Sequence, residues 1–585
     1  MPERAARQEP ASSLVIERAV EAYFSRLFRW LAPLGVALVA VALIASTSTP
    51  DDDVAAGAGP GSGQPFTLGE TGLPDGSVAE GAEESGPGVS DGSATNADDP
   101  TAVSSGPTTA GPSAVGSGGV ARNGTKCVEG ARHVPWSKYS PPCVPAFSGS
   151  NGGATSDGVT EDTITITIGF GNTTENAAIQ SLAGPATPND ADWAKTVEMY
   201  ADYFNTQFET YGREVVVKTF QMKSDYVLAD MGRDTAAAQA DAQTAKDLGA
   251  FIDLTALTNT SSLPYGNALA QLGVMAWTFP LRTAEDYAAR APYLYNFIPD
   301  GSKWAKWATN LVCQRMAGLP AIYAGGNERG KPRKFGVILV NIPEWNAAGQ
   351  LTRRLIKEQC GVDTVPLTYN FDLGTFSQYG ASMMAQMRSE QVTTILCVCD
   401  PLGPIFMTQS ATDDGYFPEW IYHNQGIVDS NYDARQLEHS FSNGPALPAS
   451  NLTEAFRVFR AAYPGQDPPD RPYFTWIYGI MMQIFSSVQM AGPQLTPTTF
   501  FNAMRSLPRS QDGGDYGPWW GDSSMPYGGG FTPWAGMQVT RWGPDAPSPD
   551  GGDSGYWTPC PGNTFYPFAD LRPWGAKGTQ LDCPA

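Results

Sequence analysis

Hydrophobic and polar residues follow two alternating patterns between residues 159 and 400. Ile164, Ile166 and Ile168 alternate with threonines, which is typical of a β-strand. Residues 192–208 carry large apolar side chains at intervals of three and four, which is typical of an α-helix. The same patterns predict strands at 214–220, 250–257, 273–279, 334–340, 364–370 and 392–400, and helices at 234–249, 302–316, 344–361 and 376–391. Two successive blocks of alternating strands and helices predict two lobes, each built on a parallel sheet.

A cluster of small polar residues follows the predicted strand at 251–257. The cluster consists of Thr258, Asn259, Thr260, Ser261 and Ser262, and a predicted helix begins there. Such side chains cap the free N–H groups of a first helical turn. In open α/β sheets, however, ligands bind at the carboxyl ends of the strands, so the cluster also fits a ligand site. The local pattern leaves both interpretations open.

Three more helices are predicted after residue 450. Residues 451–454 have the spacing of a capping box before a helix at 455–463. The segment 474–492 is a predicted helix whose apolar stretch, 476–485, is too short to span a membrane and is therefore expected to be a buried core helix. Residues 496–507 form the last predicted helix.

The last 75 residues are rich in Trp, Tyr, Pro and Gly. We expect their rings to pack onto a lobe from loops and hairpins. The alternative is a carbohydrate-binding platform, for which Trp519, Trp520 and Trp534 are the candidates.

The net charge of −22 argues against nucleic acid as a partner, because such partners require a basic surface. Half of this charge comes from residues 51–121, which hold eleven Asp and Glu and no Lys or Arg. Residues 47–122 contain almost no large apolar side chain, so they cannot bury enough surface to offset the entropy of ordering. We therefore expect a disordered tether there.

Residues 30–45 form an uninterrupted apolar run. As a helix, this run would extend about 24 Å, somewhat less than the roughly 30 Å core of a bilayer. Arg18, Arg26 and Arg29 precede the run and acidic residues follow it, so the rest of the chain is expected outside the cytoplasm. Both an uncleaved transmembrane anchor and the hydrophobic region of a signal peptide fit this pattern, which predicts a protein on the cell membrane or a secreted one.

The eight cysteines agree with an exported chain. We expect disulfides that staple irregular segments, Cys127–Cys143 and Cys560–Cys583, and a third between Cys313 and Cys360. Cys397 and Cys399 lie two residues apart on one predicted strand, where a bridge would be strained, and are interpreted as buried thiols.

Features of an enzyme are few. His133, His423 and His439 are the only histidines, and no G-x-S-x-G or G-x-x-x-x-G-K motif is present. Asp413 and Asp414 are adjacent carboxylates, but they lie in a predicted loop, where Asp favours turns. No cysteines have metal-ligand spacing. We expect neither catalysis nor a cofactor or metal.

The order of elements resembles the leucine/isoleucine/valine-binding family of substrate-binding proteins. Residues 158–176, GVTEDTITITIGFGNTTEN, are similar to the opening strand of that family, and residues 127–143, CVEGARHVPWSKYSPPC, look like an extension of actinobacterial members. The similarity covers roughly residues 158–545. It implies the type I periplasmic-binding fold, two doubly wound α/β lobes that close on a small ligand about a hinge.

With this resemblance the chain divides into seven parts. They are a cytoplasmic N-terminus at 1–29, an anchor or signal segment at 30–46, a linker at 47–122, a Cys-stapled extension at 123–158, lobe 1 at 159–298 and about 430–495, lobe 2 at about 299–429 and 496–545, and a C-terminal extension at 546–585.

In the first lobe, the resemblance implies that two strand exits hold the carboxylate of a ligand. The residues concerned are Thr258, Asn259, Thr260 and Ser261 at one exit, and Thr278 and Arg282 at the next. Free N–H groups and the positive end of a helix dipole favour an anion there. Arg282 departs from the family and is able to grip an acid group with two hydrogen bonds, although an ordinary surface arginine is the alternative.

In the second lobe, the resemblance implies contacts from Asp400, Trp345, Asn424 and Gln425. Amino-acid-binding members place a carboxylate for the ligand's ammonium group where this chain has Asn424 and Gln425. A buried ammonium without a counter-charge is costly, so an α-amino acid is disfavoured unless Asp400 or Asp429 replaces that carboxylate. Trp345 is expected to stack on the ligand or to be a core aromatic.

The expected function is extracytoplasmic capture of a small polar solute, of amino acid, amide or carboxylate type, for an ABC-type permease on a separate chain. The alternatives are a membrane-tethered ligand sensor and a cell-wall or glycan-binding module without a transport role.

Overall fold

The computed structural model describes residues 118–171, 190–255, 262–278, 281–423, 431–444, 452–507, 531–547, 554–560, 564–568 and 574–583, apart from 472, 533 and 535. These residues belong to one compact unit of the chain. No helix among them is both long and apolar enough to cross a membrane. The apolar run at 30–45 and the acidic linker at 47–122 are outside the described ranges, except for the last five linker residues.

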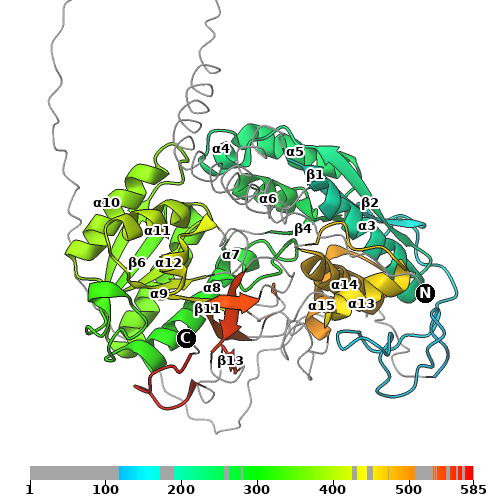
Figure 1. Cartoon of the computed structure of the whole chain (residues 1–585). Coiled ribbons are helices and arrows are strands. Elements are labelled where there is room, and N and C mark those ends of the chain that lie inside the picture. The colour runs from blue at the N-terminus through cyan, green and yellow to red at the C-terminus, as the bar shows by residue number, and fades with distance from the viewer. Residues whose placement is uncertain are drawn as a thin grey trace, which may run out of the picture. The chain divides into compact units, whose positions relative to one another are not determined.

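The first sheet has five parallel strands in the order β2-β1-β3-β4-β5. Their bounds are β1 Thr163–Phe170, β2 Glu214–Gln221, β3 Ile252–Asp253, β4 Met275–Trp277 and β5 Leu294–Tyr295. The isoleucines Ile164, Ile166 and Ile168 of β1 are fully buried, as their alternation predicts. Helices α3 Asp190–Gln207, α4 Tyr226–Asp230, α5 Thr235–Asp247, α6 Leu263–Gln271 and α7 Ala284–Ala288 connect the strands (Figure 1). This sheet and its helices are lobe 1.

The second sheet has eight strands, and its central part is parallel. The parallel strands are β6 Phe335–Val340, β7 Thr364–Tyr369, β8 Thr394–Val398, β9 Glu419–Tyr422 and β10 Ser440–Gly444. The antiparallel strands β11 Gly536–Pro547, β12 Ser554–Pro559 and β13 Phe565–Pro567 extend the edge next to β10. Its helices are α8 Gly301–Asn310, which continues as a π-helix at Leu311–Met316, the 3₁₀ turn Gly326–Glu328, α9 Pro343–Cys360, α10 Phe376–Ser389, α11 Gly403–Asp413 and α12 Ala434–Leu437. This sheet and its helices are lobe 2. The predicted α/β architecture with two parallel-sheet lobes is confirmed.

The late helices α13 Glu454–Ala462, α14 Phe474–Ala491 and α15 Pro497–Ser506 pack with lobe 1 (Figure 1). Tyr478 of α14 meets Tyr200 of α3 with ring centroids 5.4 Å apart, and Phe500 of α15 meets Phe251 at 6.2 Å. Helix α14 is buried along nearly its whole length, because it packs against α3, α13 and α15.

Two of the predicted lobe boundaries differ from these contacts. Strand β10 falls in the stretch 430–495 expected in lobe 1, yet it pairs with β9 of lobe 2. Helix α15 falls in the stretch 496–545 expected in lobe 2, yet its Phe500 packs against Phe251 and Trp277 of lobe 1. Strand pairing and ring packing join residues far apart in sequence, which a local pattern does not reveal.

All four disulfides are formed within the described residues. Cys127–Cys143, Cys313–Cys360 and Cys560–Cys583 are bonded as predicted. The interpretation of Cys397 and Cys399 as thiols was wrong, because these two cysteines are bonded to each other where β8 ends. Side chains two residues apart on a strand lie on the same face, and the chain leaves the regular strand conformation after Val398.

The Cys127–Cys143 segment is attached to lobe 1 by buried polar contacts. His133 Nε2 lies 3.0 Å from the carbonyl oxygen of Gln207, and burial lowers the pKa of His133 to about 4. Ser137 donates a 2.6 Å hydrogen bond to the Glu454 carboxylate at the start of α13. The extension is therefore part of the folded body rather than a loose appendage.

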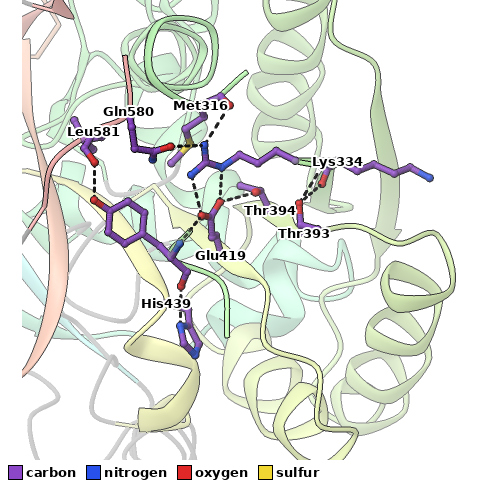
Figure 2. Close-up of polar contacts among 10 residues, drawn as sticks. Met316, Lys334, Thr393, Thr394, Glu419, His439, Gln580 and Leu581 are labelled. Atoms are coloured by element: carbon purple, nitrogen blue, oxygen red, sulfur yellow. Dashed lines mark hydrogen bonds and ion pairs between the residues drawn. The ribbon is translucent and has the colours of Figure 1, made fainter. Parts of the chain in front are cut away.

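A buried ion pair within lobe 2 lies beside the C-terminal segment. Arg333 donates from Nε and Nη2 to the two carboxylate oxygens of Glu419 at 2.8 and 2.9 Å, and both side chains are 0% exposed. The same carboxylate accepts hydrogen bonds from Thr394 Oγ1 at 2.7 Å and from the Tyr323 amide at 3.1 Å. Figure 2 shows this network, with Gln580 and Leu581 of the C-terminal segment at its border.

Candidate functional site

The exit of β4 in lobe 1 carries Thr278, whose hydroxyl is already engaged. Thr278 is buried, and its Oγ1 donates to the carbonyl oxygen of Tyr295 at 3.2 Å and lies 3.3 Å from the Tyr287 hydroxyl. A Cβ added to Gly266 of α6 would lie 3.2 Å from Thr278 Cγ2, so α6 packs tightly on this residue. Thr278 therefore helps to build the wall of the strand exit.

Arg282 follows the same strand and is fully buried, so the alternative of a surface arginine is excluded. Its Nη1 donates to Asp286 Oδ2 at 2.7 Å, whereas Nε and Nη2 have no hydrogen-bond partner among the residues that the structure describes. The Thr283 hydroxyl caps α7 by accepting from the Asp286 amide at 3.3 Å, which positions Asp286 one turn after Arg282. Asp286 also pairs with Arg290.

Glu344 brings a carboxylate from lobe 2 to Arg282. It lies in the first turn of α9, directly after the exit of β6, and its Oε1 is 3.8 Å from Arg282 Nη1. Its buried Oε2 has no hydrogen-bond partner within the described part of the chain. The backbone joins the lobes at the same place, because the Gly301 amide donates to the carbonyl oxygen of Arg282 at 2.7 Å. A Cβ on Gly301 would come within 2.6 Å of the Ala348 side chain, so this junction has room only for glycine.

Asp230, at the end of α4, is the third carboxylate of this region. Its Oδ1 accepts a 2.7 Å hydrogen bond from the Leu263 amide at the start of α6. The pKa of Asp230 is raised to about 7, mainly by burial and to a smaller extent by the Glu344 charge, while the Leu263 amide and Arg282 lower it. Arg282, Glu344 and Asp230 thus form an interacting polar group, which we call the Arg282 cluster.

The two sheets approach each other at the carboxyl ends of their strands. The Arg282–Glu344 contact joins the exit of β4 to the exit of β6. Tyr226 and Phe371, which follow β2 and β7, have ring centroids 6.4 Å apart. These contacts place strand exits of both lobes together, which is the region where open α/β sheets bind ligands.

Asp400 lies at the exit of β8 in lobe 2, where its carboxylate caps α11. It accepts hydrogen bonds from the Leu402 and Gly403 amides at 2.8 and 3.0 Å and from the Tyr369 hydroxyl. Burial raises the pKa of Asp400, and these hydrogen bonds act in the opposite direction. The side chain is buried and engaged, so its local role is that of a helix cap.

Trp345 is a buried aromatic at the start of α9. Its ring meets the His423 ring edge-on with centroids 5.0 Å apart. The ring of Trp304 also meets His423 edge-on, at 6.2 Å. Burial lowers the pKa of His423 to about 4, so this imidazole is neutral at physiological pH. Of the two interpretations of Trp345, the core aromatic agrees with its 5% exposure.

Six predicted site residues lie outside the described ranges. They are Thr258, Asn259, Thr260, Ser261, Asn424 and Gln425, and they remain predictions. The chain on either side of the first four is well anchored. Ser262 caps α6, and Asp253 at the end of β3 accepts hydrogen bonds from Thr167 Oγ1 at 2.6 Å and Tyr265 Oη at 3.0 Å.

The structure therefore brings Arg282 together with two residues that the sequence pattern did not single out, Glu344 and Asp230. Glu344 had a readable signal, since it is an acidic residue in the first turn of a helix that follows a predicted strand. Asp230 had none, because α4 is a five-residue helix without a periodic pattern. Within the described residues, no group of three His, Cys, Asp or Glu side chains is arranged to hold a metal ion.

No family model matches the chain, and no curated protein matches its sequence. Several solved structures have a similar fold. The leucine-, isoleucine-, valine-, threonine- and alanine-binding protein from Brucella ovis, in a closed conformation, is 12% identical over 72% of this chain and 99% of that chain, with a TM-score of 0.49.

The fatty acid ABC transporter substrate-binding protein from Thermomonospora curvata is 14% identical over 73% of this chain and 97% of that chain, with a TM-score of 0.47. An ABC transporter substrate-binding protein from Desulfitobacterium hafniense, in complex with Leu, is 16% identical over 67% of this chain and 100% of that chain, with a TM-score of 0.42. These structures belong to the class that the sequence resembles. At such TM-scores the likeness carries no argument about ligand or activity, and the fold stated above rests on the sheet topology.

Proposed function

We propose that this protein is an extracytoplasmic solute-binding protein that captures a small polar ligand, of amino acid, amide or carboxylate type, between its two lobes. The observation that carries the proposal is the meeting of strand exits from two parallel sheets at the Arg282–Glu344 contact. Buried charged groups with unpartnered atoms are expensive in a protein interior, and a ligand is one means of partnering them.

Delivery of the solute to an ABC-type permease is part of the proposal and rests on the family resemblance. The same holds for the place of action. The basic residues before the apolar run at 30–45 support a folded body outside the cytoplasm, either tethered through that run or secreted after its removal.

The glycan-binding alternative loses one of its three candidate residues. Trp534 is 3% exposed and donates from Nε1 to the carbonyl oxygen of Phe297 at 2.5 Å, so its ring is not available to stack on a polysaccharide. Trp519 and Trp520 lie outside the described ranges.

A thermal-shift screen of the purified full-length chain tests the proposal. The panel contains amino acids, short amides, carboxylates and sugars. A ligand present at about a hundredfold excess over its Kd should stabilise the folded state by about 2.7 kcal/mol. Thr260→Ala and Ser261→Ala should weaken the effect of a true ligand, and a substitution on the exposed face of α9, Arg354→Lys, should not. Absence of stabilisation by every compound of the panel would refute solute capture.

A further inference from the structure

Arg282 leaves one particular edge of its guanidinium group open. The two unpartnered nitrogens, Nε and Nη2, are neighbours on the same edge of this planar group, and together they form the fork that fits the two oxygens of a carboxylate. Nη1, which holds Asp286, points from a different edge. Arg282 is 0% exposed, so water does not replace the missing partners at the surface.

Two other buried arginines, Arg333 and Arg213, fill the same edge, whereas buried Arg315 lacks a partner at Nε alone. In Arg333, Nε and Nη2 donate to the two oxygens of Glu419 at 2.8 and 2.9 Å. In Arg213, Nε donates to the carbonyl oxygen of Thr160 at 2.7 Å and Nη2 to that of Asn151 at 2.8 Å. The fold is thus able to satisfy a buried guanidinium, and Arg282 stands out because no described residue occupies its fork.

The Nη2 end of the fork lies beside the first turn of α6. A Cβ added to Gly266 would lie 3.8 Å from Arg282 Nη2. Helix α6 begins at Leu263, directly after the predicted site residues 258–261. The fork therefore lies at a strand exit beside a helix N-terminus, and both features favour a negatively charged group.

We propose that the captured solute is a small organic acid whose carboxylate occupies the Nε and Nη2 edge of Arg282. This inference rests on the proposed function and specifies its ligand class. The unpartnered Oε2 of Glu344 accepts a hydrogen bond from a donor group elsewhere on the same solute, such as a hydroxyl. Because Glu344 belongs to lobe 2 and Arg282 to lobe 1, such a solute contacts both lobes at once.

The charges around the fork determine how binding depends on pH. Arg282 and Arg290 are balanced by Asp286 and Glu344, so an incoming carboxylate adds one negative charge to a neutral set. Asp230 is the group there that titrates near neutrality, with a pKa of about 7. A bound anion raises this pKa further, so Asp230 takes up a proton on binding, and the solute binds more tightly at pH 6 than at pH 8.

Matched pairs of an acid and its amide test the inference on the full-length chain. The pairs are lactate and lactamide, isovalerate and isovaleramide, and benzoate and benzamide, each titrated by thermal shift and calorimetry. At least one acid should raise the Tm, and its amide should bind about ten- to a hundredfold more weakly, because the amide cannot place two acceptors on the fork. This comparison uses the unaltered protein, so it does not depend on the folding of a variant.

Substitutions identify the residue responsible. Arg282→Lys keeps the charge but removes the fork, so it should weaken the acid about tenfold or more and leave the amide almost unaffected. Arg354→Lys, the same change at an exposed position of α9, should alter neither affinity. Asp230→Asn should abolish the difference between the acid affinities at pH 6 and pH 8.

The outcomes separate this inference from the proposed function. If sugars or amides stabilise the chain and acids do not, solute capture stands and the acid inference is overturned. An acid that binds Arg282→Lys as tightly as the unaltered chain also overturns it. Equal acid affinity at both pH values overturns the role of Asp230. If no compound of either panel stabilises the chain, both proposals fail.

Discussion

The buried pair of Arg333 and Glu419 allows a sharp test of how lobe 2 is stabilised (Figure 2). We consider Glu419→Leu, Arg333→Met and the double variant. Glu419→Leu leaves a guanidinium that is 0% exposed without its counter-charge. Breaking a buried pair in this way costs about 3–5 kcal/mol, because the remaining charge has lost both its water and its partner.

The double variant should lose less stability than the two single variants added together. Replacing both charges by apolar side chains of similar size is often neutral. Here the Tyr323 amide and the Thr394 hydroxyl lose their acceptor as well, and such unsatisfied buried groups cost about 1–3 kcal/mol each. We therefore expect the double variant to be less stable than the unaltered chain, but more stable than the sum of the two single changes predicts.

Differential scanning calorimetry of the four proteins measures the coupling. For a lobe of this size, a loss of 3–5 kcal/mol corresponds to a fall in Tm on the order of 10 °C. The matched control is Lys334→Met, because the neighbouring Lys334–Glu390 pair is exposed and should contribute less than about 1 kcal/mol. If the two single effects simply add in the double variant, or if the Lys334 change is as damaging as the Arg333 change, the reasoning about buried pairing is refuted.

Three further predictions concern other buried groups. Burial raises the pKa of Asp253 from 3.8 to about 6, so the contribution of this carboxyl group to stability is greatest below pH 4 and is lost as the pH rises through 6. The difference between the unfolding free energies of the unaltered chain and of Asp253→Asn, measured by denaturation, should therefore shrink by about 2.4 kcal/mol between pH 4 and pH 7. A constant difference would contradict the raised pKa. Asp400→Ala should lower the free energy of unfolding, measured in urea without ligand, by about 1–3 kcal/mol, because α11 loses its cap. An effect seen only in the presence of ligand would contradict this capping role. Mass spectrometry should find none of the eight cysteines labelled by iodoacetamide in denaturant before reduction, and all of them labelled after reduction. Labelling of Cys397 and Cys399 without reduction would restore the thiol interpretation.

The sequence alone was sufficient for the elements and for the lobes in outline. The alternation of Ile164, Ile166 and Ile168 indicates β1, because side chains of a strand alternate between its two faces. The apolar stretch 476–485 indicates a core helix, because a stretch of this length is too short to cross a bilayer and so has to be buried inside the protein. Both features depend only on neighbours within one segment, and both are confirmed.

The pairing of distant segments was decided by the tertiary structure. Strand β10 and helix α15 are recognisable locally, but their lobes follow from contacts with β9 and with Phe251, more than a dozen and more than two hundred residues away. The bond between Cys397 and Cys399 depends on how the chain bends after β8. Neither a hydrophobic pattern nor a spacing contains this information.

The candidate site shows the same division. The family resemblance marked Arg282 as a candidate at a strand exit, but the sequence did not tell whether the arginine was buried or which of its atoms were occupied. Only the fold brings Glu344 from another lobe to 3.8 Å and leaves the Nε and Nη2 edge open. Strand and helix formation are local, so the sequence determined them, whereas burial and pairing of charges depend on which surfaces meet, and that is fixed only when the lobes pack.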